Sequence, residues 1–303
     1  MNRKQFLGSM AAVAIMPELP AIASEKKQPV RFAHLTDIHV RPGDIPETGM
    51  ARALQHVRNS RVRVDFIVNG GDAIMDALEA SRTQTQSQWE VFHRILRTEN
   101  NLPVYHCIGN HDIWGWFLKD GSARNDSQYG KRWTLDELGL TRPYYSFSRG
   151  AWQVIVLDST QLNPAGGYIA RLDEEQLEWL KGELQSTSGK FVCILSHIPI
   201  LSISSGLFFD RTESNGDLKI QRNLMHSDFL VLKKLFRSHP QVRACISGHT
   251  HLQDAIDYLG VKYYCNGAVS GNWWKGSFQE FGPAYALIEL HDDGRVERRM
   301  VAY

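Results

Sequence analysis

Five apolar, strand-like segments of the sequence are each followed by side chains that could bind metals or transfer protons. These are Asp37 and His39, Asp72, Asn110 to Asp112, His197, and His249 with His251. Carboxylate, amide and imidazole groups suit borderline cations such as manganese, iron and zinc. The set is too large for one tetrahedral ion, so we expect two ions with one aspartate shared between them.

A glycine precedes three of these polar groups, at Gly71, Gly109 and Gly248. Because glycine has no Cβ, the chain can turn tightly at these positions. Open α/β sheets bind ligands in the crevice beyond their strand ends. The sequence therefore predicts sharp turns that carry the polar side chains to one edge of a sheet.

The elements that would position these residues alternate between strand and helix patterns. The expected strands cover 30–37, 64–72, 102–112, 190–197 and 242–249, and the expected helices cover 50–60, 81–98, 172–185 and 228–236. Such alternation favours crossover connections and a largely parallel sheet with outer helices. Hairpins are expected at 144–159, 254–265 and 285–301. No linker divides the chain, so we expect one domain with two packed sheets.

Composition excludes several functional classes. The formal net charge of the 303-residue chain is +1, so charge predicts no nucleic-acid-binding patch. No apolar run is long enough to form a transmembrane segment. The cysteines lie in apolar segments at Cys107, Cys193, Cys245 and Cys265. We interpret them as reduced core thiols, with a Cys245–Cys265 bridge as the alternative.

The N-terminal residues 1–24 have the order of a secretory signal peptide. Arg3 and Lys4 precede an apolar stretch at 6–16, and Ala21-Ile22-Ala23 follows. This order predicts an exported, periplasmic protein whose mature domain covers 25–303. The signal is similar to a twin-arginine signal, and a Sec signal is the alternative route. A frayed helix on a cytoplasmic protein is the alternative to export.

The ordered motifs D-x-H, G-D, G-N-H-D, a single His and G-H-x-H resemble those of the calcineurin-like metallophosphoesterases. The resemblance covers about residues 30–270 and is strongest to bacterial class III cyclic-nucleotide phosphodiesterases and small purple acid phosphatases. It implies a four-layer α/β/β/α sandwich of two mixed sheets with flanking helices. It also implies that Asp72 bridges two ions and that His111 is the catalytic histidine. One ion would be held by Asp37, His39 and His251, and the other by Asn110, His197 and His249.

The resemblance implies a metal-dependent phosphoric ester hydrolase that cleaves small phosphodiesters by attack of a metal-bridging hydroxide. A phosphomonoesterase and a non-catalytic metal-binding scaffold are the alternatives. Purple acid phosphatases carry a tyrosine ligand three residues after the bridging aspartate, where this chain has Met75. We therefore expect a manganese, iron–manganese or zinc pair.

Three further residues are candidates for the substrate pocket. Trp114 and Trp274 could stack on a nucleobase, and packing in the core is the alternative for both. His226 lies in the irregular segment 202–227. For Asp112 we expect either that it orients His111 or that it caps a helix.

Overall fold

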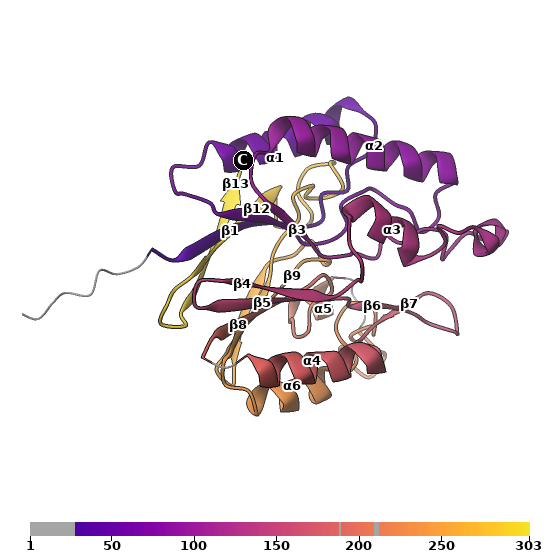
Figure 1. Cartoon of the computed structure of the whole chain (residues 1–303). Helices are drawn as coiled ribbons and strands as arrows, with labels where there is room; N and C mark the ends of the chain where they lie inside the picture. Colours follow the sequence, from indigo (N-terminus) through magenta and orange to yellow (C-terminus); the bar gives the residue numbers. More distant parts are fainter. Residues whose placement is uncertain (1–27, 188, 209–211) are drawn as a thin grey trace, which may run out of the picture.

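The computed structural model describes residues 28–187, 189–208 and 212–303, so the predicted signal peptide at 1–24 lies outside the described residues. Two large mixed sheets face each other, and helices cover their outer surfaces (Figure 1). This is the four-layer α/β/β/α arrangement that the resemblance implies. Within the described ranges no helix is both long and apolar enough to cross a membrane.

The first sheet has five strands in the order β13-β12-β1-β2-β3. β1, β2 and β3 run parallel, β12 runs antiparallel to β1, and β13 runs antiparallel to β12. The strand bounds are β1 Val30–Leu35, β2 Phe66–Asn69, β3 Val104–His106, β12 Ala284–Leu290 and β13 Val296–Ala302. The carboxyl ends of β1, β2 and β3 therefore meet at one edge of this sheet.

The second sheet has six strands in the order β10-β11-β9-β8-β5-β4. β11, β9, β8 and β5 run parallel, and the edge strands β10 and β4 run antiparallel to their neighbours. The bounds are β4 Tyr145–Arg149, β5 Trp152–Leu157, β8 Phe191–Ser196, β9 Val242–Ser247, β10 Asp254–Tyr258 and β11 Val261–Cys265.

The helices follow from amphipathic patterns with clear start signals. α2 begins with a capping box between Ser81 and Gln84, and the side chain of Asp173 caps α4 as expected. α1 begins at Asp44, six residues before the expected start, because Pro46 is tolerated in a first helical turn. The bounds are α1 Asp44–Arg58, α2 Arg82–Glu99, α3 Lys131–Leu138, α4 Glu174–Ser186, α5 Ser204–Leu207 and α6 Phe229–Arg237, with a 3-10 turn η1 at Ser122–Asn125.

A two-stranded hairpin, which the sequence analysis did not predict, follows the second sheet's β5. It consists of β6 Thr160–Leu162 and β7 Tyr168–Ala170, each only three residues long. The segment after α5 joins it: Ala170 N donates to Arg222 O and Ser227 N donates to Ala170 O, both at 2.8 Å. These hydrogen bonds attach the hairpin to this segment near the strand ends.

An apolar layer between the sheets holds the two halves of the domain together. Phe32 and Phe66, from neighbouring strands, are fully buried and stack with ring centroids 5.1 Å apart. Trp152 meets them from the second sheet within the same cluster. The four cysteines are buried free thiols, and the alternative Cys245–Cys265 bridge does not form. Burial of these apolar groups is the main source of stability for this arrangement.

We predict that Phe66→Ala lowers the free energy of unfolding by about 3–5 kcal/mol, because it leaves a cavity between the sheets. Leu230→Ala is the control, since Leu230 is 68% exposed, and it should change the free energy by less than about 0.5 kcal/mol. Denaturant unfolding of the metal-free protein measures both. A cost below about 1 kcal/mol for Phe66→Ala would show that this layer does not hold the sheets together.

Candidate metal centre and catalytic cleft

The candidate site lies where the parallel strands of both sheets end. β1, β2 and β3 of the first sheet lead into Asp37 and His39, Asp72, and Asn110. β8 and β9 of the second sheet lead into His197, and into His249 and His251. The seven residues proposed as ligands from the sequence therefore come from five strands, and the structure brings them into two adjoining groups.

Sharp turns carry these side chains inward. Asp37, His39, Asp72, His249 and His251 have φ values of 54°, 49°, 53°, 73° and 58°. Residues other than glycine avoid this left-handed region, and such strain concentrates at functional sites. Backbone bonds hold the turns, since Asp37 N donates to the carbonyl of Gly71 at 3.0 Å and His39 N to that of Asp72 at 2.9 Å.

The first group contains Asp37, His39 and His251, all buried. The Nε2 atoms of His39 and His251 lie 3.1 Å apart, and Nε2 of His251 lies 3.5 Å from Oδ1 of Asp37. Nitrogen and oxygen ligands lie about 2.0–2.2 Å from a zinc-sized cation, which puts neighbouring ligand atoms about 3–3.5 Å apart. The first group therefore fits one cation.

The second group contains His197, His249 and Asn110. Nε2 of His197 lies 3.2 Å from Oδ1 of Asn110 and 3.3 Å from Nδ1 of His249. These separations fit a second cation by the same comparison. A single zinc-like site would leave several of these buried polar atoms without a role.

Asp72 joins the two groups. Its Oδ2 lies 3.6 Å from Nε2 of His39 in the first group and 3.3 Å from Nε2 of His197 in the second. Its other oxygen, Oδ1, accepts a hydrogen bond of 2.8 Å from the backbone N–H of His111. One oxygen of Asp72 is therefore anchored, and the other lies between both groups.

Backbone carbonyls set the orientation of the four histidine rings. Each ring places its second nitrogen, the one turned away from the group, against a carbonyl oxygen. The pairs are His39 Nδ1 with Met75 O (3.3 Å), His197 Nδ1 with Gly70 O (3.0 Å), His251 Nδ1 with Gly271 O (2.5 Å) and His249 Nε2 with Asn223 O (2.9 Å). A carbonyl only accepts, so that nitrogen carries a proton and the facing nitrogen is the one that can bind a metal.

Asp112 neither orients His111 nor caps a helix, contrary to both expectations. Its buried carboxylate accepts hydrogen bonds from four backbone N–H groups: those of Gly109 and Asp72 at 2.9 Å, Ala73 at 2.8 Å and Ile74 at 3.3 Å. It thereby ties the turn after β3 to the turn after β2. Because these turns carry Asn110 and Asp72, Asp112 fixes the position of Asn110 relative to Asp72.

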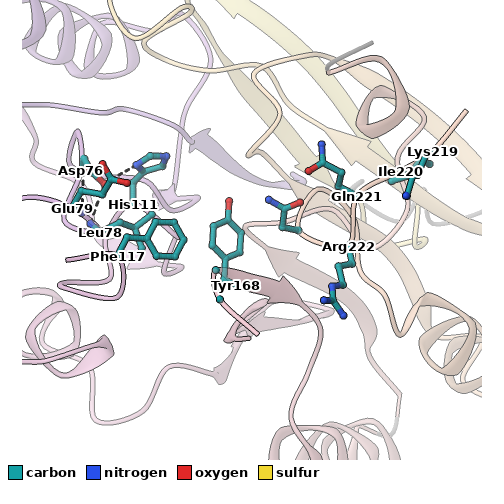
Figure 2. Close-up of a pocket in the computed structure, with 13 residues that line it drawn as sticks. Asp76, Leu78, Glu79, His111, Phe117, Tyr168, Lys219, Ile220, Gln221 and Arg222 are labelled. Carbon is teal, nitrogen blue, oxygen red and sulfur yellow. Dashed lines mark hydrogen bonds and ion pairs between the residues drawn. The ribbon is translucent and has the colours of Figure 1, made fainter. Parts of the chain in front are cut away.

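The residue that orients His111 is Asp76, which the sequence analysis missed. His111 Nδ1 lies 3.1 Å from Oδ1 of Asp76, as Figure 2 shows. Burial alone would lower the pKa of His111, but the charges of Asp72 and Asp76 outweigh it and raise that pKa above its ordinary value. The sequence signal that could have identified Asp76 is its position, four residues after Asp72 in the same turn.

A cleft of about 840 Å³ opens beside His111 (Figure 2). Its lining includes Asp76, His111 and Phe117 together with Tyr168 and Arg222. Openings of this size hold small organic molecules. Tyr168 belongs to the β6–β7 hairpin and Arg222 to the segment after α5, so a hairpin that was not predicted from the sequence helps to shape this cleft.

The three candidate pocket residues lie elsewhere. Trp114 is 3% exposed, donates from its indole to the Ala80 carbonyl and packs edge-on against Trp133 in the core. The indole of Trp274 donates to the His39 carbonyl, and its ring lines a separate surface pocket beside α1.

His226 is also outside the cleft. It is buried between Asp228, whose carboxylate lies 2.9 Å from Nδ1, and Ser196, whose hydroxyl lies 3.2 Å from Nε2. These contacts satisfy both ring nitrogens. None of the three residues lines the cleft beside His111, and the polar atoms of all three are bonded within the fold.

The buried histidines differ in their affinity for protons. Burial would lower the pKa of His197, but Asp72 and Asp37 raise it to about 9. Burial and the neighbouring His197 lower the pKa of His249 to about 3. In the metal-free protein, a proton on His197 therefore balances the charge of Asp72, and a cation that binds there must displace it.

The sequence profile of the calcineurin-like phosphoesterases matches residues 30–253, which include all seven candidate ligands. The chain belongs to the calcineurin-like phosphoesterases. Its strand ends carry a dinuclear metal-binding centre, in keeping with this family.

This phosphoesterase is similar to several named proteins. A 3',5'-cyclic-nucleotide phosphodiesterase of Nostoc sp. is 24% identical over 282 residues, which are 89% of this chain and 91% of the relative. The 3',5'-cyclic adenosine monophosphate phosphodiesterase CpdA of Pseudomonas aeruginosa is 23% identical over 254 residues, 82% of this chain and 78% of the relative.

Among solved structures, a dimetal phosphatase from Danio rerio has a TM-score of 0.61 at 17% identity, covering 91% of this chain and 100% of that one. GAP50, the anchor in the inner membrane complex of Plasmodium, has a TM-score of 0.55 at 18% identity, covering 91% and 85%. Both likenesses concern the fold.

We predict that the affinity of the metal-free phosphoesterase for Mn²⁺ falls about ten-fold for each pH unit between pH 8 and pH 6. Below its pKa of about 9, His197 carries a proton that the ion must displace, and the protonated fraction approaches one as the pH falls. Isothermal titration at constant ionic strength measures this slope. An affinity that stays constant from pH 8 to pH 6 would mean that His197 does not compete with the ion.

Proposed function

We propose that this phosphoesterase hydrolyses phosphodiester bonds of small substrates at a dinuclear metal centre. The observation that carries the proposal is the position of Asp72 Oδ2, within 3.6 Å of a histidine from each ligand group. His111, the candidate catalytic residue, lies directly beside it and lines the cleft.

In this proposal Asp37, His39 and His251 would hold one ion, and Asn110, His197 and His249 would hold the other. Asp72 would be shared between them. Bound cations in such a pair neutralise the charge of the phosphate ester and lower the pKa of water. The nitrogen and oxygen ligands suit manganese, iron–manganese or zinc. Met75 offers its carbonyl to His39 and has no phenolate, which argues against a ferric site.

His111 is proposed to act on the substrate through Nε2. Because its Nδ1 is held by Asp76, Nε2 is the nitrogen left to face the cleft. The raised pKa favours the protonated ring, the form in which Nε2 carries a proton. His111 can therefore donate a hydrogen bond to the phosphoryl group, or a proton to the departing oxygen.

One observation favours a diester over a monoester. The cleft extends from His111 past Phe117 to Arg222, which leaves room for the organic group of either ester. The relatives from Nostoc sp. and P. aeruginosa are named as cyclic-nucleotide phosphodiesterases.

The direct test compares bis(p-nitrophenyl) phosphate with p-nitrophenyl phosphate, each assayed with Mn²⁺, Fe²⁺ and Zn²⁺. We expect kcat/KM for the diester to exceed that for the monoester with at least one metal. The opposite ratio with every metal would replace the proposal with a phosphomonoesterase. No hydrolysis of either ester by a chain that holds two ions would favour the metal-binding scaffold.

We predict that His111→Ala retains two ions per chain but lowers kcat by about 10²–10⁴-fold, the usual size of an acid–base contribution. Asp76→Asn serves as the matched variant: it should lower kcat less and shift the basic limb of the pH–rate profile to lower pH, because it removes a charge that raises the pKa of the proton donor His111. Elemental analysis and pH-dependent kinetics give both readouts. Unchanged turnover of metal-loaded His111→Ala would remove His111 from the mechanism.

A further inference from the structure

Two aromatic rings lie side by side in the lining of the cleft. Phe117 comes from the segment after β3, and Tyr168 is the first residue of β7. Their ring centroids lie 6.1 Å apart and their planes differ by 15°, so the rings are nearly parallel. Figure 2 shows them side by side next to His111. A flat group that stacks on one ring would therefore also be parallel to the other.

The backbone holds both rings in place before any substrate binds. Phe117 N donates to the carbonyl of Leu78 at 3.0 Å, which fixes the first ring to the turn that carries Asp76. Tyr168 pairs with Leu162 in the β6–β7 hairpin. Gly167, at φ 77°, brings the hairpin backbone close to the Phe117 ring, since a Cβ there would lie 4.0 Å from it. Such preorganisation reduces the entropic cost of binding.

The pair also lies beside the proposed metal ligands and His111. The Tyr168 ring stands edge-on to the ring of His249, a proposed ligand, with centroids 6.3 Å apart. Asn223 connects the two, because its carbonyl accepts from His249 and its side chain interacts with the Tyr168 hydroxyl. A group joined to the phosphate through a short linker would meet these rings.

We propose that Phe117 and Tyr168 form a ring-binding wall that selects phosphate esters with a planar aromatic group, such as a nucleobase, beside the scissile phosphate. The inference rests on the phosphoesterase activity proposed above and assigns the specificity of the same site. Stacking of a base on an aromatic side chain is sequence-tolerant, so the wall favours planar groups as a class.

The test compares kcat/KM for 3',5'-cyclic AMP with that for sn-glycero-3-phosphocholine, a diester without a ring. In Phe117→Leu and Tyr168→Leu we expect this ratio to fall about ten-fold relative to the wild-type holoenzyme, in line with measured base stacking. Tyr168→Phe keeps the ring and should keep the ratio within about three-fold. Trp179→Leu is the matched control. Trp179 lies on α4, packs against Tyr144 and does not line the cleft, so this variant should leave the ratio unchanged.

A second measurement uses only the wild-type protein, so it does not depend on whether a variant folds. The wild-type holoenzyme should be inhibited by AMP at about one tenth the concentration needed for ribose 5-phosphate, which lacks the base. Equal inhibition by the two, or an unchanged substrate ratio in both leucine variants, would overturn the ring-binding wall.

The two proposals fail separately. If the chain cleaves only monoesters, the same ratio is taken between AMP and glycerol 2-phosphate, and the phosphodiesterase proposal falls while the wall is still tested. If it cleaves none of these esters, calorimetric Kd values of AMP and ribose 5-phosphate on the metal-loaded protein give the ratio. Equal Kd values contradict the wall, and a ten-fold preference for AMP supports it.

Discussion

The carboxylate of Asp72 lies between two groups of imidazole and oxygen ligands, and each group combines residues from both sheets. Asp37, His39 and Asn110 follow strands of the first sheet. The remaining three ligands, His197, His249 and His251, follow β8 and β9 of the second. Without cations, this concentration of buried polar atoms would be costly, because desolvated charges need partners. The proton held by His197 offsets part of that cost in the metal-free protein. The same arrangement of buried ligand atoms favours the binding of divalent ions.

The packing between the sheets determines whether this pocket exists. Phe32, Phe66 and Trp152 set how closely the two layers approach, and that approach sets the distance between the ends of their strands. Asp112 acts at shorter range, because its four backbone bonds join the turns after β2 and β3. The strained turns at Asp37 and His249 are then held by the surrounding bonds rather than by their own preferences.

Much of the fold and the candidate ligand set could be predicted because both have strong local signals. Alternating strand and helix patterns predicted the two sheets, and polar residues after strand ends pointed to a shared site. Asp76 was missed because its role depends on a turn whose shape is set by Asp112. The β6–β7 hairpin was missed because strands of three residues have too little periodicity to detect.

The aromatic residues show a second limit of prediction from the sequence. Trp114 and Trp274 were chosen for the pocket, whereas Phe117 and Tyr168 line it. Residue type does not indicate which ring is buried, because burial depends on neighbours far away in the sequence, such as Trp133 for Trp114. The start of α1 was placed late because the expected helix was read from the amphipathic pattern at 50–60, whereas the helix begins at Asp44 with Pro46 in its first turn.

The measurement that tests the central claim most directly is the metal content of purified Asp72→Ala beside that of the wild type. The account predicts two ions per wild-type chain and the loss of both in Asp72→Ala, because each group would lose the oxygen that they share. Asp76→Asn, which alters a neighbouring carboxylate that belongs to neither group, should retain two ions. Two ions per chain in correctly folded Asp72→Ala would contradict the shared-aspartate centre.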